Sequence, residues 1–439
     1  MVMKMRAGFA IIFFAALVFL PIRASATTLI YSGDEFAQIS AEGDYALAAD
    51  IFLPSDRVPI SVFRGTLDGA GFEIRGATNP LFWVLDGAEI RNLALCGAEM
   101  HVRGDTARDE FAVGILAGKV NGGVIEGVDV FGGVIANEAS NEASGASKSP
   151  ETESGIIGGL IGAARDADIK NIRMFNVQIV ADEGADLRAV GGLAGVLQNC
   201  RVADAVVLNT EIRVGARSSG GFVGLVRENS VFEDCHAVAE IHENESPVGI
   251  SGGFAGLADG SRSGVGAEFS RCRAGGSVRA ATAGGFVGRL SGRSRVAHSH
   301  VGGVVSAENA GGFAGEITNA SRIEFSSAVS AVFGAENAGG FVAIIAADGA
   351  PNTITNSLAL GNIVASESGN ARRFAARLDH DGINNCYAAL GMAIIHGENS
   401  ANAVPNPYSA DGGDIPISRA KRAVGTGDMC RGRHIPSKP

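Results

Sequence analysis

Proline and long apolar runs are both scarce in this chain. Only 12 of its 439 residues are proline, against 62 glycines, and no second long apolar run follows the one that ends at Leu20. A glycine-rich chain with little apolar content would stay disordered, but 46% of these residues are hydrophobic, which is enough to build a core. We therefore expect short strands joined by tight turns, and no membrane-spanning helix after the first apolar run.

Basic residues are also in deficit. The chain has 36 lysines and arginines against 47 aspartates and glutamates, a formal net charge of −11. Nucleic-acid binding depends on lysine and arginine at the phosphates, so this balance argues against a nucleic-acid partner. An acidic surface is typical of a protein that must stay soluble.

The first 26 residues are typical of a signal peptide. Lys4 and Arg6 precede the apolar run, and Ala24–Ser25–Ala26 matches a small-x-small cleavage pattern. The alternative, an uncleaved membrane anchor, needs a longer apolar run. No cysteine stands at the cleavage point, as a bacterial lipoprotein would need. We predict that residues 1–26 are removed and that the remainder is secreted or held at the cell surface, with the periplasm as the alternative location.

One short phrase, Gly-Gly followed by two apolar residues and a small residue, recurs at intervals of 27–33 residues. Its second glycines are Gly159, Gly192, Gly221, Gly253, Gly285, Gly312 and Gly340. A period of this size indicates one supersecondary unit stacked on copies of itself. We predict an all-β fold, a single-stranded parallel β-helix (solenoid) of about ten coils. The glycines are expected to allow positive φ and to leave room for a sharp turn.

Two columns of side chains are expected to stack inside this helix. The first contains large apolar residues directly after Gly-Gly, among them Phe222, Phe254, Phe286, Phe313 and Phe341. The second contains Cys200, Cys235, Cys272 and Cys386, with serines at the same place in other repeats. Because serine replaces cysteine there, we interpret these cysteines as small buried filler with free thiols. Disulfides are the alternative, since adjacent coils would bring their Cα atoms within bonding range.

The phrase, followed by Asn-Cys as in Asn199–Cys200 and Asn385–Cys386, resembles the GLUG motif of secreted bacterial proteins. The stretch from Phe63 to Ile74 also resembles the segment that precedes such repeats. The resemblance covers roughly residues 45–392. It implies a parallel β-helix, an extracellular setting and contact with a host or matrix partner. GLUG repeats occur in surface adhesins and in the non-catalytic region of bacterial immunoglobulin A metallopeptidases, so the resemblance indicates a fold and not a reaction.

We divide the chain into four parts. After the leader, residues 27–62 lack the phrase and are expected to cap the helix, whose strand edges would otherwise be open. Residues 63–398 are expected to form the helix, with a mobile insertion at 137–154 that is rich in Ser, Glu, Ala and Asn. Residues 399–439 are expected to be an irregular tail.

Catalytic motifs are missing. The string most similar to a zinc-peptidase motif begins at His242 and lacks the second histidine. Residues 249–253 match Gly-x-Ser-x-Gly, but the repeat explains the match, because Ser251 merely precedes Gly-Gly. We predict that the protein is not an enzyme and has no cofactor and no metal.

Two short strings are candidate binding residues. His298 and His300 flank Ser299, so both imidazoles should face outward, where they are either simply solvated or near enough to share a metal ion. Arg103–Gly104–Asp105 spells the tripeptide that integrins recognise, and a turn is the alternative interpretation.

The sequence thus predicts a non-catalytic exported repeat protein. It would present a solenoid surface for adhesion, or for binding a host or matrix glycoprotein or glycan. The alternative is a carbohydrate-active β-helix, a polysaccharide lyase or hydrolase with carboxylate pairs on its lateral face. The oligomeric state stays open.

Overall fold

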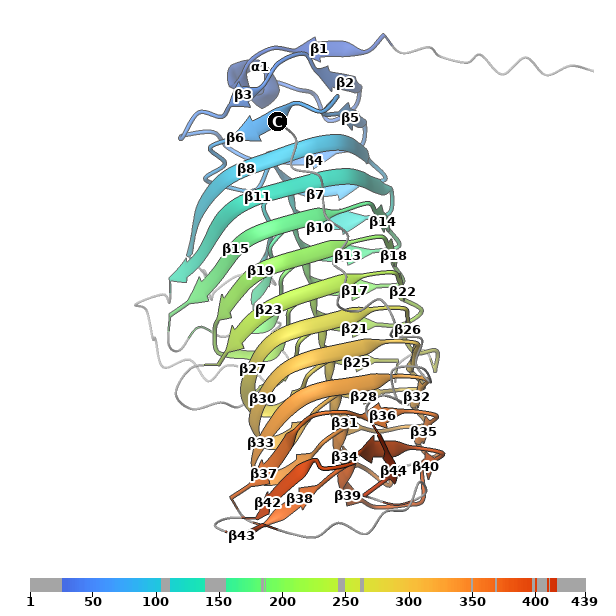
Figure 1. Cartoon of the computed structure of the whole chain (residues 1–439). Coiled ribbons are helices and arrows are strands. Elements are labelled where there is room, and N and C mark those ends of the chain that lie inside the picture. Colours follow the sequence, from blue (N-terminus) through green and yellow to red (C-terminus); the bar gives the residue numbers. More distant parts are fainter. Residues whose placement is uncertain are drawn as a thin grey trace, which may run out of the picture.

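The chain forms a parallel β-solenoid of about nine turns with almost no helix (Figure 1). The computed structural model describes residues 26–103, 111–138, 155–182, 185, 187–243, 249–260, 264–348, 350–367, 369–396, 399–400, 409 and 411–416. The predicted all-β parallel solenoid is confirmed, with slightly fewer turns than expected. In the described ranges, no helix is both long and apolar enough to span a bilayer.

Each coil has four strand positions. For one coil these are β17 (Ala194–Gln198), β18 (Arg201–Ala203), β19 (Val206–Arg213) and β20 (Ala216–Gly220). Equivalent strands of successive coils pair in parallel and in register, as Val202 does between Ile169 and Phe232. The four positions therefore build an eleven-stranded sheet, a short-strand face, a long-strand face and a set of return strands that lead into the Gly-Gly phrase.

The eleven-stranded sheet contains β4 (Ile60–Phe63), β7 (Phe82–Asp86), β10 (Ala117–Asn121), β13 (Ile161–Arg165), β17, β21 (Val223–Arg227), β25 (Ala255–Asp259), β28 (Val287–Ser291), β31 (Ala314–Ile317), β34 (Val342–Ile345) and β39 (Ala375–Leu378). The short-strand face contains β5 (Thr66–Asp68), β14 (Asp168–Lys170), β18, β22 (Val231–Glu233), β26 (Glu268–Ser270), β29 (Arg295–Ala297), β32 (Arg322–Glu324), β35 (Thr353–Thr355) and β40 (Ile383–Asn384).

The long-strand face contains β6 (Glu73–Arg75), β8 (Glu89–Arg103), β11 (Val124–Glu138), β15 (Arg173–Ala181), β19, β23 (His236–His242), β27 (Arg273–Gly284), β30 (His300–Gly311), β33 (Ser327–Gly339), β36 (Leu358–Ala359), β37 (Ile363–Ser366), β41 (Tyr387–Ala389) and β42 (Ala393–His396). The return strands are β9 (Ala112–Val113), β12 (Gly155–Gly158), β16 (Leu187–Gly191), β20, β24 (Ile250–Gly252) and β38 (Asn370–Arg372). In β27, β30 and β33 the long and return strands are continuous.

The expected aromatic column lies at the centre of the solenoid. The five phenylalanines that follow Gly-Gly are fully buried, and Phe374 extends their column. Successive ring centroids are 4.6, 5.0, 4.9, 4.9 and 4.8 Å apart, and the ring planes are nearly parallel. Because strands in a sheet are about 4.8 Å apart, the coil spacing itself sets the distance between rings. Each ring therefore packs on an identical neighbour without a void.

The glycines of the phrase are required by space and not by backbone conformation, which corrects the expectation of positive φ. None of the seven second glycines has φ in the left-handed region. A Cβ on Gly221 would lie 2.2 Å from the carbonyl oxygen of Gly253, its equivalent one coil on. A Cβ on Gly220 would lie 2.0 Å from the carbonyl oxygen of Val223. Backbone thus touches backbone at this corner, both within a coil and between coils.

Residues 28–52 add strands to the first end of the solenoid and place a helix there. β1 (Thr28–Ile30) pairs with β2 (Asp44–Leu47), and β2 pairs with β5, so the first rungs lie within the expected cap. β3 (Ile51–Phe52) pairs with β6. The helix α1 (Gly33–Ala37) begins where Ser32 Oγ accepts a hydrogen bond from the Glu35 amide at 3.2 Å.

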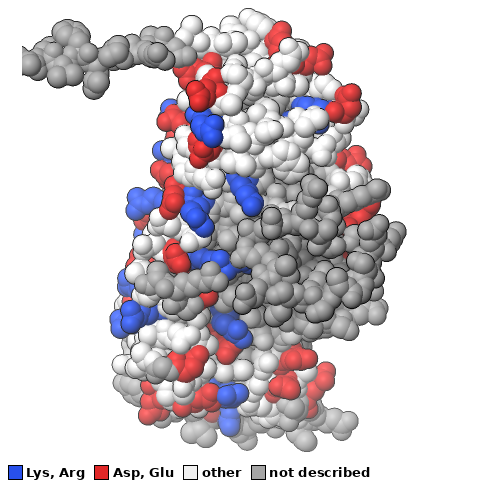
Figure 2. Space-filling model, turned by 180° about the vertical axis from the view of Figure 1, so that it is seen from behind, with Lys and Arg blue, Asp and Glu red and all other residues white. Residues whose placement is uncertain are grey.

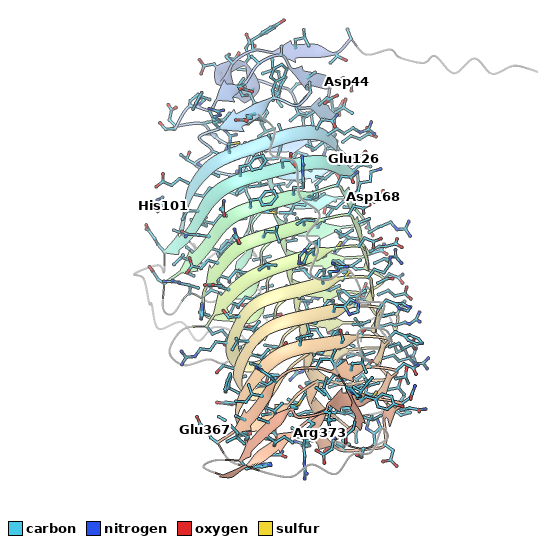
Figure 3. All side chains as sticks on the ribbon, viewed as in Figure 1. Asp44, His101, Glu126, Asp168, Glu367 and Arg373 are labelled. Carbon is cyan, nitrogen blue, oxygen red and sulfur yellow. The ribbon has the colours of Figure 1, made fainter. Side chains whose placement is uncertain are left out.

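The other end differs from the expected irregular tail. Residues 413–415 form β44 (Gly413–Ile415), which pairs in parallel with β41. β43 (Asn399–Ser400) pairs with β42 antiparallel. Arg373 stands where earlier phrases have their second glycine, and its buried guanidinium binds Asp414 Oδ1 at 2.5 Å (Figure 3). A side chain at this position fills the space that a further coil would need.

Substituting a phrase glycine should unfold the solenoid, whereas a glycine on an open surface should tolerate the same change. We expect Gly253→Ala to cost about 3 kcal/mol or more, because its Cβ would lie 2.2 Å from the Gly285 carbonyl oxygen. The matched control is Gly275→Ala, whose nearest neighbour would be 3.5 Å away. Urea unfolding followed by circular dichroism measures both. Equal stability of the two variants would contradict the steric role.

Candidate functional site

The long-strand face is a broad outward surface between two edges of the solenoid. In Figure 3, Glu126 marks the edge where β11 begins and His101 the opposite edge, where β8 ends. Along each long strand alternate side chains point to the core, so the remaining ones form outward columns that run from coil to coil. One column includes Asp129, Arg173, Val206 and His236, in that order.

A sharp corner separates the short strand from the long strand in every coil. Its residue has positive φ in ten successive positions, which are Asn92, Gly127, Asn171, Asp204, Asp234, Arg271, His298, Phe325, Asn356 and Asn385. From Asn171 to Asn356, each of these amides donates to the carbonyl just before the equivalent residue of the next coil. Asn, Asp and Gly suit this place, because glycine has no Cβ and the short Asn and Asp side chains tolerate the left-handed region.

Three consecutive coils break this pattern with large side chains. Arg271, His298 and Phe325 have φ of 55°, 52° and 49°, and all three are exposed. A large residue in the left-handed region costs about 1–2 kcal/mol relative to its ordinary conformation. Asparagine at the same corner avoids this cost and adds a contact between coils, as Asn385 Nδ2 does by donating to Asn356 Oδ1 at 2.6 Å.

The three large residues contact neighbouring coils along the corner. Arg271 donates through Nε and Nη2 to Asp234 at 2.9 and 2.8 Å, and its Nη2 also binds Glu233. The His298 ring stacks on the Phe325 ring, with centroids 5.1 Å apart and an interplanar angle of 6°. Exposed ion pairs and ring stacks contribute about 0–1.5 kcal/mol each, so they at most offset the conformational cost.

A second column of side chains lies two residues after the corner, on the long-strand face. Arg273 is exposed and stands in register between His236 of one coil and His300 of the next. His300 Nδ1 lies 2.9 Å from Ser327 Oγ. We call Arg271, Arg273, His298, His300 and Phe325 the corner ridge.

The electrostatics of the corner ridge centre on Arg273. Burial, and then the charge of Arg273, lowers the pKa of His236. Burial also lowers the pKa of His300 to about 4, with smaller contributions from Arg273 and His298. Both imidazoles are therefore neutral near pH 7. Arg273 itself makes no ion pair or hydrogen bond with the part of the chain that the structure describes.

Several charges on the short-strand face, in contrast, are paired, including those on the first residues of β8 and β11, which pair with the short strands β5 and β14. Arg91 binds Glu89 at 3.0 Å, Lys170 binds Glu126 at 3.4 Å and Arg295 binds Glu324 at 2.8 Å. Figure 2, the rear view, shows residues of both signs interspersed along one long edge of the molecule. Exposed pairs of this kind contribute about 0–1 kcal/mol each to stability, so we explain them as surface packing.

A shallow groove crosses the long-strand face on the coils before the corner ridge. Its volume is about 380 Å³, and its lining includes Gln178, Asn209, Glu211, Val238 and Glu240. Gln178 donates to Glu211 at 3.2 Å. Glu240 has no hydrogen-bond partner among the described residues. Amide and carboxylate groups over an apolar floor are suited to hydroxyl-bearing ligands.

The other predicted binding residues lie apart from this site. Arg103 is the last residue of β8, and Gly104 and Asp105 lie outside the described residues. Ser251, from the Gly-x-Ser-x-Gly string, is fully buried and donates to Glu243 at 2.9 Å. Of the expected insertion, residues 137 and 138 end β11, and 139–154 lie outside the described ranges.

The two histidines have separate partners. His298 stacks on Phe325, and His300 contacts Ser327. Among the described residues, no group of three or more His, Cys, Asp or Glu side chains is arranged to hold a metal ion. Both histidines therefore belong to the corner ridge, where His298 offers a ring contact and His300 a hydrogen-bonding imidazole beside Arg273.

The cysteine column differs from the predicted alignment, because Cys200 lies in another column. The register of β18 with β22 places Cys200 beside Ser230, and that of β19 with β23 places Ala205 beside Cys235. This coil has two left-handed corners five residues apart, at Asn199 and Asp204, and both precede a small buried residue. The predicted alignment therefore matched Asn199–Cys200 to Asp234–Cys235, whereas the true equivalent is Asp204–Ala205. Cys235 and Cys272 do stack, and the described cysteines are free thiols.

Sequence reasoning missed the corner ridge, although a signal was present. Cys235 and Cys386 follow Asp or Asn, whereas Cys272 follows Arg271 and Ser299 follows His298. Reading the residue before this column would have found the three departures. That these three residues are in the left-handed region is known only from their φ angles, which the sequence alone does not supply.

Comparison with known proteins shows no family for this chain. No protein-family model and no curated protein matches it. Two solved structures align with it at 15% and 14% identity. One, an "IgA1 Protease", has a TM-score of 0.36 over 93% of this chain and 25% of that one. The other, a Bacteroides ovatus protein provisionally named an immunoglobulin A1 protease, has a TM-score of 0.26 over 91% and 86%. The chain thus spans a quarter of the first, and similarity this low carries no functional argument.

Buried thiols should resist modification until the fold opens. Burial raises the pKa of Cys200 to about 11 and that of Cys386 to about 12, so almost no reactive thiolate exists at pH 8. We expect iodoacetamide at pH 8 to label both cysteines only after guanidinium unfolding, as read by peptide mass spectrometry. Fast labelling of either residue in the native chain would contradict this burial.

The neutral state of His300 should make stability depend on pH. Its folded pKa of about 4 lies below the ordinary histidine value of about 6.5. Between these values the unfolded chain binds more protons, so stability falls as pH drops from about 6.5 toward 4. Urea unfolding at pH 7 and pH 4.5 should show a smaller difference for His300→Gln than for the natural chain. An unchanged difference would show that His300 does not contribute.

Proposed function

We propose that this chain is a non-catalytic exported binding protein. Its long-strand face and corner ridge would hold a glycan, or the glycan part of a host or matrix glycoprotein. Several coils contribute to this surface, which suits an extended ligand that follows the solenoid axis. Adhesion to a surface that carries such glycans follows if the protein is held at the cell surface.

The observation that carries this proposal is the conformational cost of the corner ridge. Arg271, His298 and Phe325 occupy a corner where Asn, Asp and Gly serve in the other coils. Strain that packing does not require is concentrated at functional sites, because selection for stability alone would remove it. The exposed ring of Phe325, with 45% of its surface accessible, adds an apolar contact that a solvated corner does not need.

The groove beside the ridge supports the same function. Glu240 and Asn209 can hydrogen bond to sugar hydroxyls, and Val238 offers an apolar contact to the less polar face of a sugar ring. The carbohydrate-active alternative requires a carboxylate pair placed for acid and base catalysis. Glycan cleavage by the purified chain would favour that alternative over binding alone.

Restoring asparagine at the corner should separate binding from folding. We expect His298→Asn/Phe325→Asn to be at least as stable as the natural chain, because Asn accepts the left-handed conformation and can join the Asn356 ladder. The same variant should lose most binding on a glycan and matrix-glycoprotein array. Thermal unfolding and array signal measure the two effects.

The matched control is Phe52→Asn, which removes another exposed phenylalanine, in the N-terminal region and far along the chain from the ridge. It should leave the array signal unchanged. Undiminished binding by the His298→Asn/Phe325→Asn variant would overturn the ridge as the site. An array with no signal for the natural chain would overturn the proposed function itself.

A further inference from the structure

We infer that the corner ridge binds an acidic sugar residue, whose carboxylate or sulfate group is held by Arg273. This inference rests on the proposed function and adds the chemical class of the ligand. It follows from the position of Arg273, from the partners of the charged groups around it, and from the open floor beside it.

Arg273 is an available cation in an otherwise acidic protein. Its guanidinium is exposed and has no partner among the described residues. The acidic groups at the neighbouring corner, Asp234 and Glu233, are already bound by Arg271. Arg273 is therefore not neutralised by them. A guanidinium binds carboxylate or sulfate oxygens with two parallel hydrogen bonds, which gives strength and direction.

The histidines on either side can add hydrogen bonds without adding charge. Ser327 Oγ contacts His300 Nδ1, which leaves Nε2 of that ring without a described partner. A neutral imidazole nitrogen can donate to, or accept from, a sugar hydroxyl. Because His236 and His300 stay neutral near pH 7, Arg273 carries the positive charge among these three residues in register, while Arg271 is paired with Glu233 and Asp234.

The surface next to Arg273 has room for a sugar ring. Gly275 and Gly302 pair in register two residues beyond Arg273 and His300. A Cβ on Gly302 would meet nothing within 4 Å, and its φ is ordinary, so neither crowding nor conformation requires glycine there. Phe325 and Val329, exposed by 45% and 49%, provide apolar contacts on the next coil. A ring lying over Gly302 can thus reach Arg273 on one side and apolar carbon on the other.

The test compares acidic and neutral oligosaccharides of equal length. The probes are a polyuronate, a sulfated glycosaminoglycan, and their carboxyl-reduced and desulfated forms. We expect the purified full chain to bind one or both acidic probes at least about tenfold more tightly than the neutral forms, and Arg273→Gln to remove that difference. The two acidic probes distinguish carboxylate from sulfate.

Two control pairs separate a site from general charge and from folding. Arg201→Gln removes an exposed arginine on the short-strand face and should keep the preference for acidic probes. Gly302→Leu should fold normally and bind at least about tenfold less tightly, because its side chain covers the floor. The adjacent Gly303→Ala should instead destabilise the chain, since φ there is +142° and its Cβ would lie 1.9 Å from the Gly276 carbonyl oxygen.

The other possible results of these binding measurements would overturn either this inference or the proposed function. Equal weakening by Arg273→Gln and Arg201→Gln would show nonspecific charge attraction and overturn this inference. Tight binding of neutral glycans that Arg273→Gln does not change would also overturn it, while leaving the proposed function in place. Failure to bind any glycan, acidic or neutral, would remove the proposed function.

Discussion

Close backbone contact at the Gly-Gly corner is the constraint on which the rest of the structure depends. In the coils from Gly158 to Gly340 the two phrase glycines leave no room for a side chain, because a Cβ would lie about 2 Å from a carbonyl oxygen of the same coil or of the next one. The return strand and the following strand of the eleven-stranded sheet therefore meet through backbone, and the coil closes within about thirty residues. Once the coils are in register, the strand spacing stacks Phe222, Phe254 and their equivalents at van der Waals distance.

The same regular stacking explains why a residue that departs from the repeat is visible on this surface. Every coil repeats the same corners, so each position is compared with its equivalents in the other coils. At the corner before the long strand, most coils have Asn, Asp or Gly, which adopt the left-handed conformation at a lower energetic cost than other residues. Arg271, His298 and Phe325 do not, and they lie together on three successive coils beside an exposed arginine. In a less regular fold, such residues would not stand out from other surface side chains.

Much of the fold could be predicted from spacing alone, and the errors arose where spacing is ambiguous. The predicted Phe column was correct, because a large apolar residue directly after Gly-Gly can be buried only inside the solenoid. Cys200 was misplaced, because Asn199–Cys200 and Asp204–Ala205 are both a left-handed residue before a small buried one. Only the pairing of β19 with β23 shows which corner matches Asp234–Cys235. The role of the glycines was also mistaken, since crowding depends on neighbours in the next coil.

The sequence by itself determined the all-β class, the stacked repeat and the central column, because each depends on a periodic pattern that any coil repeats. Tertiary structure alone decided the conformation at the corners and the neighbours of each outward side chain. His298 and His300 were recognised as outward, but their separate partners, Phe325 and Ser327, belong to the following coil. Arg273 was one charged residue among many until its neighbours were known. Contacts between coils join residues about thirty positions apart, and register, which no local pattern specifies fully, sets which residues meet.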